Sequence, residues 1–514
     1  MDVLAMHTAA DPDKTAVIDG ERVMNRREFN TLVNQYADVL LGAGVRAGEK
    51  VLWVGQNSLE VVAINHAARK VGAVCVPMNY RLAPDEAQYV IDNCDAVVVL
   101  FDIEQTDQLA TIVEDCNRVR AWYCFRSQGQ APAWSQDFDA LAAAASTDEP
   151  VPVGEDETAG TTMIYTSGTT GKPKGTVRRT EASKHTGDLI GMLGWGPDDV
   201  YLSTGPLYHS APLGFMMVVQ QLGGSVVVQR HFDPEEWLAL VEKHKVTTTF
   251  SAPTPVRRAV DLPLETIKQY DCSSMRVLLA NAAPWAFELK KKYIERIDDK
   301  SLFEIYGSTE LGVNTILLPD EQMRKPGSCG RPAPGVDIKL FDDDGNEVTE
   351  PMVPGELFVL SDATFATYYK DPDKYEKGKR PDGYMSVGDI AYRDDEGFYY
   401  ICDRKNDMII SGGVNIYPAE IEAVLIAHPD IADAAVFGIP DDEWGEAVHC
   451  VVTTYDGSDV DQAELEAFCR EHLAGYKVPR SHASMKEIPR SASGKILKRE
   501  LREPYWEGRS SRVG

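Results

Sequence analysis

Short apolar runs alternate with helical periodicity in the first part of the chain. A helical pattern covers 60–71, and strand-like runs flank it at 50–55, 74–78 and 97–101. Repetition of this β-α-β kind predicts a parallel sheet covered by helices. A second cycle has a helical segment at 234–243 and apolar runs at 224–229, 247–252 and 276–280. The pattern therefore predicts two related layered α/β subdomains, which we place at 1–150 and 151–328.

The pattern of apolar and polar residues changes after residue 328. Short strands broken by Pro and Gly predict a small antiparallel β unit over 329–405, with strands at 336–341, 355–360 and 397–402. The remaining chain, 406–514, predicts an α+β domain with helices at 419–427 and 461–473 and strands at 434–438 and 449–454. The predicted fold class is thus α/β, with a large N-terminal domain over 1–405 and a small C-terminal one.

The composition limits the classes of protein to which this chain can belong. The 514 residues carry a formal charge of −28, which disfavours general affinity for nucleic acid or anionic membranes. No apolar stretch reaches the ~18 residues that span a bilayer, and the N-terminus lacks a signal-like block, so we expect a cytoplasmic protein. The nine cysteines form no C-x-x-C pair, which favours reduced thiols packed as small apolar groups. The segment 470–514 differs, with eleven Lys/Arg against five Glu.

The run Tyr165–Gly175, Y-T-S-G-T-T-G-K-P-K-G, concentrates small, hydroxyl-bearing and cationic residues after a strand-like segment. Its glycines allow close backbone approach, its hydroxyls donate hydrogen bonds, and its lysines attract anions. A Walker A loop requires a glycine, four residues and then Gly-Lys-Ser/Thr, and counting from Gly168 this run has Pro173 in place of the second glycine. The run predicts a different loop for nucleotide phosphates, formed by Thr166, Ser167, Gly168, Thr169, Thr170, Gly171, Lys172 and Lys174.

Four later clusters supply other groups that activation of a carboxylate by ATP requires. Tyr306-Gly307-Ser308-Thr309-Glu310 combines an aromatic face, a turn, hydroxyls and a carboxylate. Asp389 suits ribose hydroxyls, and Arg404 suits Asp389 or phosphate. Asp389 ends the second cluster, 382–389, and Arg404 belongs to the third, 403–422, which also contains the small-residue turn Ser411-Gly412-Gly413. The fourth is the loop 491–496 that presents Lys495.

Taken together and in this order, the motifs resemble the acyl-CoA synthetase branch of the adenylate-forming superfamily across nearly the whole chain. The resemblance implies a β-barrel at 329–405 and a C-terminal domain that rotates about a hinge. It implies two steps, in which a carboxylate and ATP give acyl-adenylate and pyrophosphate, and the thiol of CoA then displaces AMP. The implied co-substrates and metal are ATP, CoA and Mg²⁺.

The resemblance also implies roles for single residues. The loop 166–175 would hold the β- and γ-phosphates, Thr309 the α-phosphate, and Asp389 with Arg404 the ribose. Thr166 and Glu310 would bind Mg²⁺, and Lys495 would stabilise the transition state of adenylation. The residues flanking the adenine would be Ala282, Ala283, Pro284 and Tyr306, with Gly307 and Ser308 beside them.

In the second step, the implied rotation replaces Lys495 with the face of Ser411, Gly412 and Gly413. Trp444 and Tyr476 match positions that stack on the adenine of CoA in some relatives, although a tryptophan in a small domain is more often part of the core. Three positions depart from the common pattern. They are Asn406 at the hinge, Glu181 in place of a His after the phosphate loop, and Val387 before Gly388-Asp389.

The acid is expected to bind near His209 and the segments 206–210, 212–217 and 281–283, whose apolar character favours a hydrophobic acid. We interpret it first as a fatty acid, with an aryl or steroid-like acid as the alternative. Two other hypotheses stay open: an adenylating enzyme with a non-CoA acceptor, and a nucleotide-binding scaffold whose site has decayed. The pattern leaves the oligomeric state open, a homodimer included.

Overall fold

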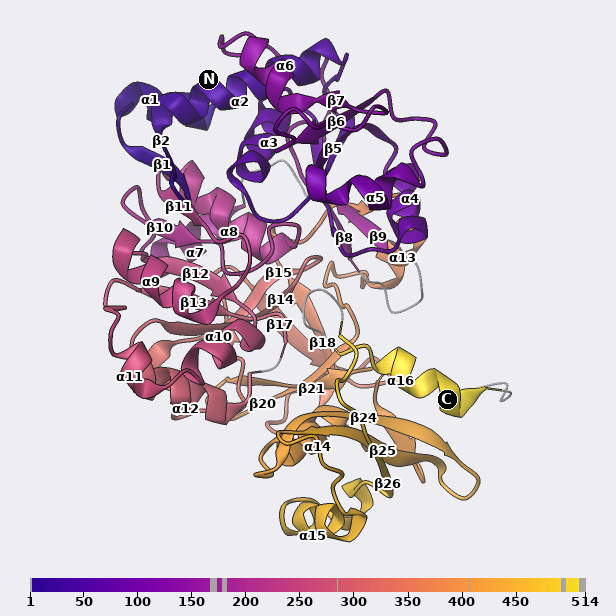
Figure 1. Ribbon diagram of the computed structural model, residues 1–514. Coiled ribbons are helices and arrows are strands. Elements are labelled where there is room, and N and C mark those ends of the chain that lie inside the picture. Colours follow the sequence, from indigo (N-terminus) through magenta and orange to yellow (C-terminus); the bar gives the residue numbers. More distant parts are fainter. Residues whose placement is uncertain are drawn as a thin grey trace.

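The computed structural model describes residues 2–166, 173–177, 183–283, 285–405, 407–490 and 496–507. Figure 1 shows two α/β layers at the N-terminal end, a β unit beside them, and a small C-terminal unit at the opposite end of the molecule. Among the described residues, no helix has both the length and the apolar character needed to cross a bilayer.

The first layer is a five-stranded parallel sheet, as the first cycle predicts. Its four longer strands are mostly apolar because both faces of the sheet are covered, which is typical of parallel sheets, whereas the two-residue edge strand is polar. Their order is β4 (Val74–Met78), β3 (Lys50–Val54), β5 (Ala96–Asp102), β6 (Ala121–Phe125) and β7 (Gln136–Asp137). The helices of this region are α1 (Val3–Ala10), α2 (Arg26–Gly42), α3 (Leu59–Lys70), α4 (Pro84–Asn93), α5 (Thr106–Ala110) and α6 (Phe138–Ala144), with the short 3₁₀ turn η1 (Ile103–Gln105).

The second layer is a nine-stranded mixed sheet. Its order is β16 (Arg331–Pro332), β15 (Gly312–Leu317), β14 (Leu302–Ser308), β13 (Val277–Ala280), β12 (Thr248–Ser251), β10 (Val200–Leu202), β11 (Ser225–Val228), β1 (Thr15–Asp19) and β2 (Arg22–Asn25). Its helices are α7 (Lys184–Leu193), α8 (Ser210–Gln221), α9 (Pro234–His244), α10 (Pro253–Val260), α11 (Leu264–Ile267) and α12 (Phe287–Arg296), and η2 (Pro319–Glu321) follows β15.

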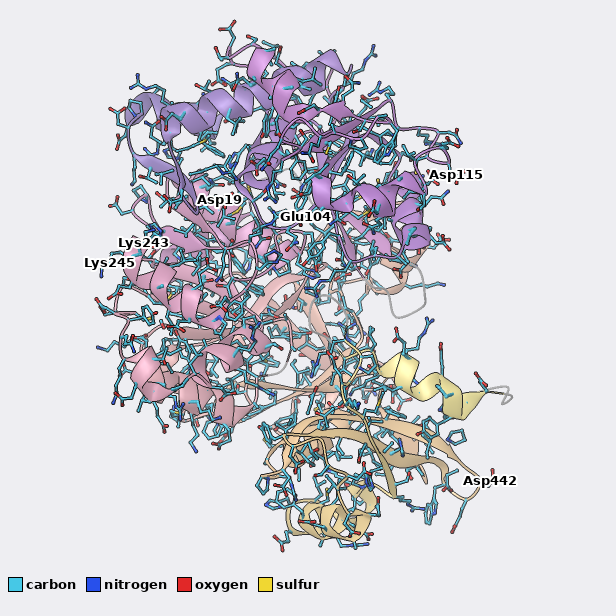
Figure 2. The ribbon with its side chains drawn as sticks, in the orientation of Figure 1. Asp19, Glu104, Asp115, Lys243, Lys245 and Asp442 are labelled. Carbon is cyan, nitrogen blue, oxygen red and sulfur yellow. The ribbon has the colours of Figure 1, made fainter. Side chains whose placement is uncertain are left out.

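The N-terminal hairpin departs from a simple division at residue 150. β1 pairs in parallel with β11, so the first strands of the chain complete the second sheet. Asp19, at the end of β1 and labelled in Figure 2, also contacts the first layer. Its carboxylate accepts a hydrogen bond from the first backbone N–H of α3, that of Leu59, at 3.1 Å. The two layers are therefore built from interleaved chain segments, and the domain limits remain a prediction.

Buried polar contacts fix the two layers against each other. Arg230 of the second layer pairs with the buried Asp102 at 3.0 Å and with Glu104 at 2.8 Å. The side chain of Asn57, after β3, donates to the carbonyl of Gly205 at 3.0 Å and accepts from the N–H of Leu207 at 2.8 Å. These contacts place the start of α8 against the first layer.

Three smaller sheets complete the fold. A three-stranded sheet joins β8 (Met163–Thr166) and β9 (Lys174–Val177) to β19 (Thr367–Tyr368), which precedes α13 (Pro372–Lys377). The predicted antiparallel unit is a four-stranded sheet of β17 (Asp337–Phe341), β18 (Gly355–Leu360), β20 (Asp389–Arg393) and β21 (Tyr399–Arg404). It occupies the region where the resemblance implies a β-barrel.

The C-terminal unit has the predicted α+β composition. Its sheet runs β23 (Val414–Ile416), β22 (Ile409–Ser411), β25 (Gly445–Thr454) and β24 (Ile431–Asp441), with β26 (Ser481–Ser484) beside β25. Its helices are α14 (Pro418–Ile426), α15 (Gln462–His472) and α16 (Lys498–Trp506), with η3 (Gly475–Lys477). All nine cysteines are free thiols, and eight of them are buried in agreement with their predicted apolar role.

Candidate active site

A cavity of about 1510 Å³ opens at the carboxyl ends of the parallel strands of the second sheet. Ligands of open α/β sheets bind at this edge, because the loops that follow the strands meet there. The lining includes Gly205 after β10, Ala252 after β12, Ala282 after β13 and Thr309 after β14. The volume exceeds the ~300–1,000 Å³ of a usual small-molecule site, so there is room for more than one ligand.

Tyr306, Asp389 and Arg404 come together although they lie far apart in the sequence. Asp389 opens β20 and Arg404 closes β21, and the antiparallel register puts the two residues opposite each other. The guanidinium of Arg404 pairs with Asp389 Oδ1 at 3.0 Å, and the hydroxyl of Tyr306 donates to Asp389 Oδ2. Burial, and next the Asp389 charge, raise the pKa of Tyr306 well above its usual value, so it remains a hydrogen-bond donor.

Glu310 meets Thr166 across a separation of 144 residues. Its carboxylate Oε1 accepts hydrogen bonds from the hydroxyl of Thr166 and from that of Tyr368, each at 3.2 Å. Next to it, the hydroxyls of Thr309 and Ser210 are 2.8 Å apart. The two residues with an expected metal role, Thr166 and Glu310, are therefore direct neighbours.

Backbone geometry explains two of the small residues. A Cβ added at Gly307 would lie 2.0 Å from the carbonyl oxygen of Gly312, because β14 and β15 shift register there, so only glycine fits. Ala282 has φ +74°, a conformation that is strained for a residue with a Cβ. Ala283 follows it, and Ser308 accepts a hydrogen bond from the N–H of Leu311 at 3.1 Å.

Lys174 and His209 have definite neighbours. The ammonium of Lys174, in β9, is paired with Asp371, just beyond β19. His209 precedes the first residue of α8 and lines the cavity, with its ring centroid 4.5 Å from that of Tyr208. Sequence reasoning missed Tyr368 and Asp371, because their partners are 58 and 197 residues away and no local pattern signals such contacts.

Several predicted residues fall outside the described part of the chain: Ser167, Gly168, Thr169, Thr170, Gly171, Lys172, Pro284, Asn406 and Lys495. The described residues around Lys495 lie at the cavity. Glu487, Ile488, Pro489 and Arg490 all line it. A β-bridge between Arg490 and Ile496 holds the two ends of the intervening segment together.

The small-residue turn of the C-terminal unit lies elsewhere. The described residues that line the cavity do not include Ser411, Gly412, Gly413, Trp444 or Tyr476. A Cβ on Gly412, which has φ +58°, would come within 2.6 Å of the Trp444 ring, whereas one on Gly413 would meet no described atom within 4 Å. Trp444 is 40 % exposed and Tyr476 52 % exposed, so neither is a core residue. Arg480 stacks over the Trp444 ring at 5.2 Å.

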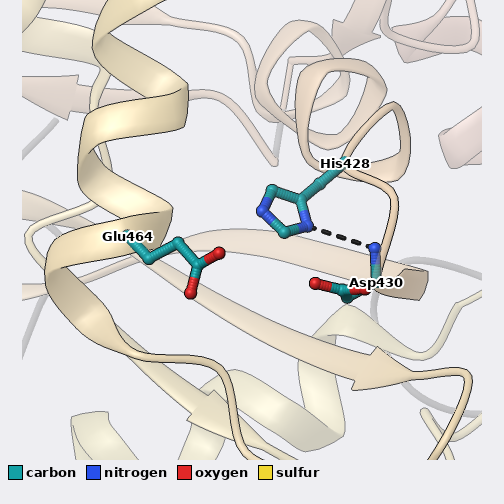
Figure 3. Close-up of side chains that lie close together, drawn as sticks. All are labelled: His428, Asp430 and Glu464. Carbon is teal, nitrogen blue, oxygen red and sulfur yellow. Dashed lines mark hydrogen bonds between the residues drawn. The ribbon is translucent and has the colours of Figure 1, made fainter.

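A second group of ionisable residues in the C-terminal unit is His428, Asp430 and Glu464 (Figure 3). Their possible ligand atoms lie within 4.8 Å of one another. However, Nδ1 of His428 accepts the backbone N–H of Asp430 at 3.3 Å, so the proton of the neutral ring is on Nε2. A protonated nitrogen cannot coordinate a cation, and we therefore interpret the group as structural.

Comparison with known proteins identifies the family of the chain. The chain matches the family model "AMP-binding enzyme" over residues 4–369 and "AMP-binding enzyme C-terminal domain" over 420–495. It is 34% identical over 501 residues to a feruloyl-CoA synthase of an Amycolatopsis species, covering 96% of each chain. It is 32% identical over 492 residues to the long-chain-fatty-acid–CoA ligase FadD13 of Mycobacterium tuberculosis, covering 94% of this chain and 93% of the relative.

Among solved structures, the ATP-bound MatB of Rhodopseudomonas palustris superposes with a TM-score of 0.86 at 27% identity, covering 98% of this chain and 99% of that one. The chain belongs to the AMP-binding enzyme family, in the CoA ligase branch of the adenylate-forming superfamily. Its enzyme class is that of the acid–thiol ligases.

Proposed function

We propose that this enzyme joins a hydrophobic carboxylic acid to CoA in two steps, with cleavage of ATP to AMP and pyrophosphate. The observation that carries the proposal is the convergence of Tyr306, Asp389 and Arg404, because Gly307, Ser308 and Thr309, which follow Tyr306 directly, line the cavity together with apolar residues of α8. Asp389 accepts from two fixed donors and retains lone pairs for ribose hydroxyls. The feruloyl-CoA synthase and the fatty-acid–CoA ligase among the relatives support CoA as the acceptor.

In the first step, the carboxylate of the acid attacks the α-phosphorus of ATP. A new P–O bond forms, the bond from the α-phosphorus to the oxygen that bridges to the β-phosphate breaks, and pyrophosphate leaves with that oxygen and the bonding electrons. The hydroxyl of Thr309, next to Ser210 at 2.8 Å, is available to donate to the α-phosphate. Lys495 would neutralise charge on the carboxylate and the α-phosphate, since the segment before it lines the cavity. Loop 167–172 and Lys174 would hold the departing pyrophosphate, for which Lys174 must share its charge with Asp371.

The residues present suit a magnesium ion. Glu310 offers a carboxylate and Thr166 a hydroxyl, both hard oxygen ligands, and the two are already in contact. The bound ion would neutralise phosphate charge. Tyr368 holds the carboxylate of Glu310 from the other side and so restricts its orientation.

In the second step, the CoA thiol attacks the acyl carbon and AMP leaves with the C–O bond electrons. Gly412, Gly413, Trp444 and Tyr476 lie outside the cavity, so this step requires the C-terminal unit to move. The exposure of Trp444 and the stacked Arg480 favour a role as a nucleotide-binding surface. The acid is a fatty acid or an aryl acid, and both chemistries occur among the relatives.

The test follows AMP, pyrophosphate and thioester over a panel of fatty, aryl and amino acids, with and without CoA. We expect pyrophosphate with hydrophobic acids alone, and thioester by mass spectrometry only when CoA is added. Sustained AMP release without any thioester in the presence of CoA would exclude the ligase function. Metal dependence is measured separately, by binding of Mn²⁺ in the presence of a non-hydrolysable ATP analogue, in the wild type and Glu310→Gln.

A further inference from the structure

One side of helix α8 forms a wall of the cavity. Met216 and Val219 occupy its opposite side and are buried in the core. From the nucleotide end outward, the lining residues of this helix are Ser210, Ala211, Pro212, Leu213, Gly214, Phe215, Met217, Val218 and Gln221. The small members of this series are Ser210, Ala211 and Gly214, and Gly214 is directly followed by the large Phe215.

Gly214 is the unusual member of this series. It is an exposed residue in the interior of a helix, and a Cβ added there would meet no described atom within 4 Å. Neither a positive φ nor a close neighbour requires glycine at this position. Since glycine weakens a helix relative to alanine, its use here indicates that the space beside it is needed.

The space lies close to the reacting end of the site. Ser210, whose hydroxyl is 2.8 Å from that of Thr309, is one turn before Gly214. Four residues of helix correspond to about 6 Å along its axis. The widened part of the cavity therefore begins within a few bonds of the position expected for the acid's carboxylate.

Aromatic side chains form the wall next to this space. Phe215 is in contact with Trp195 in a T-shaped arrangement, with ring centroids 5.7 Å apart, and is stacked on Phe250 at 5.9 Å. All three rings line the cavity. Such rings interact favourably with the face or edge of another flat ring.

We propose that the acid carries a flat ring within a few bonds of its carboxylate, and that Gly214 is the residue that admits this ring. The inference rests on the proposed ligase function and chooses the aryl acid over the unbranched fatty acid. A linear chain would leave the space beside Gly214 unfilled and would lose contacts on that side. A ring fills it and packs against Phe215.

The experiment compares kcat/KM for benzoate and cinnamate with that for hexanoate and decanoate in the wild type, Gly214→Ala and Gly214→Leu. We expect the wild type to prefer the ring acids. Gly214→Leu places a branched side chain in the ring's space, so it should lower kcat/KM for ring acids by roughly 10-fold or more. It should leave the linear acids and the KM for ATP within about 2-fold, and Gly214→Ala should fall between.

Gly187→Leu is the matched control, because Gly187 is also exposed inside a helix, α7, and a Cβ there would likewise meet no described atom within 4 Å. It does not belong to the cavity lining, so its preference should equal that of the wild type. A wild-type preference for linear acids, or equal losses for both kinds of acid in Gly214→Leu, would overturn the inference and leave the ligase function standing. If no acid of the panel yields pyrophosphate or thioester, the ligase function itself fails.

Discussion

The nucleotide site of the large domain and the exposed face of the C-terminal unit hold their functional side chains in opposite ways. In the large domain, the side chain of Asp389 is 7 % exposed and has two partners from different elements. On the C-terminal unit, Trp444 and Tyr476 are 40 % and 52 % exposed. Figure 2 places Asp442, near Trp444 in the chain, at the tip of the β24–β25 hairpin, away from the large domain.

The difference indicates which of the two half-reactions the present position of the C-terminal unit serves. A site with fixed donors and acceptors binds its ligand without reorganisation, which is what electrostatic stabilisation of a reaction requires. An exposed aromatic face must first move to a ligand, and conformational steps of this kind often limit turnover. In this arrangement, the described residues that the C-terminal unit contributes to the cavity are Met485 and Glu487–Arg490, which precede Lys495 in the sequence.

The largest expected effect comes from separating binding from chemistry with Lys495→Ala. The large domain should still bind ATP with an affinity within about 3-fold of the wild type, because the ribose and metal residues are untouched. Adenylation, measured as exchange of labelled pyrophosphate into ATP, should fall by roughly 10²–10³-fold because one charge-stabilising group is lost.

Lys486→Ala is the control for this prediction. It removes an exposed lysine from the same segment and should leave exchange unchanged. Thioester formation from synthetic acyl-adenylate should also survive in Lys495→Ala. Normal exchange in Lys495→Ala would show that the C-terminal unit contributes nothing to the first step.

The junction of the two regions gives the next prediction. The carboxylate of Asp403, at the end of β21, accepts the N–H of Ala419 at 3.0 Å and lies 3.8 Å from Lys498. Burial raises its pKa from 3.8 to about 6, although Lys498 opposes the shift. The folded state therefore favours the protonated form. The contribution of this protonated carboxyl group to the free energy of unfolding is complete below about pH 4 and is lost as the pH rises through 6.

Asp403→Asn removes that ionisation. At pH 8 the variant should exceed the wild type in free energy of unfolding by up to about 3 kcal/mol, and at pH 4 the two should be equal. Urea denaturation at both values measures the difference. Asp395→Asn, which changes an exposed carboxylate in the β20–β21 turn, should differ from the wild type by less than about 0.5 kcal/mol at either pH. A lower stability of Asp403→Asn at pH 8 would mean that the pair with Lys498 outweighs the cost of burial.

The sequence predicted elements where one physical signal dominated. The apolar runs at 50–55, 74–78 and 97–101 became β3, β4 and β5, because strands buried on both faces are apolar throughout. The pairing of β1 with β11 could not be predicted, since the two strands are about 200 residues apart in the sequence. The sequence pattern of the short β1–β2 hairpin is compatible with either sheet.

In the candidate active site, too, contacts between residues far apart in the sequence were harder to predict than the motifs themselves. Motif order was enough to group Tyr306, Asp389 and Arg404, which the structure brings into contact. The contacts of Tyr368 with Glu310 and of Asp371 with Lys174 depend on β19 lying against β9, a register that no local pattern encodes. The empty space beside Gly214 was equally hidden, because a glycine within an apolar helix has the same sequence signal whether it faces a core or a cavity.

The smallest expected effect concerns the exposed face itself. Trp444→Ala should raise the KM for CoA by about 5- to 10-fold, since it removes an aromatic surface worth about 1 kcal/mol toward a nucleotide base or the stacked Arg480. Pyrophosphate exchange should be unchanged, because Trp444 lies outside the cavity. Tyr455→Ala, on the same unit and 72 % exposed, is the control and should leave both measurements as in the wild type. If Trp444→Ala lowers pyrophosphate exchange as strongly as thioester formation, Trp444 stabilises the C-terminal unit as a whole and has no specific role in the second step. The two regions would then not correspond to the two steps of the reaction.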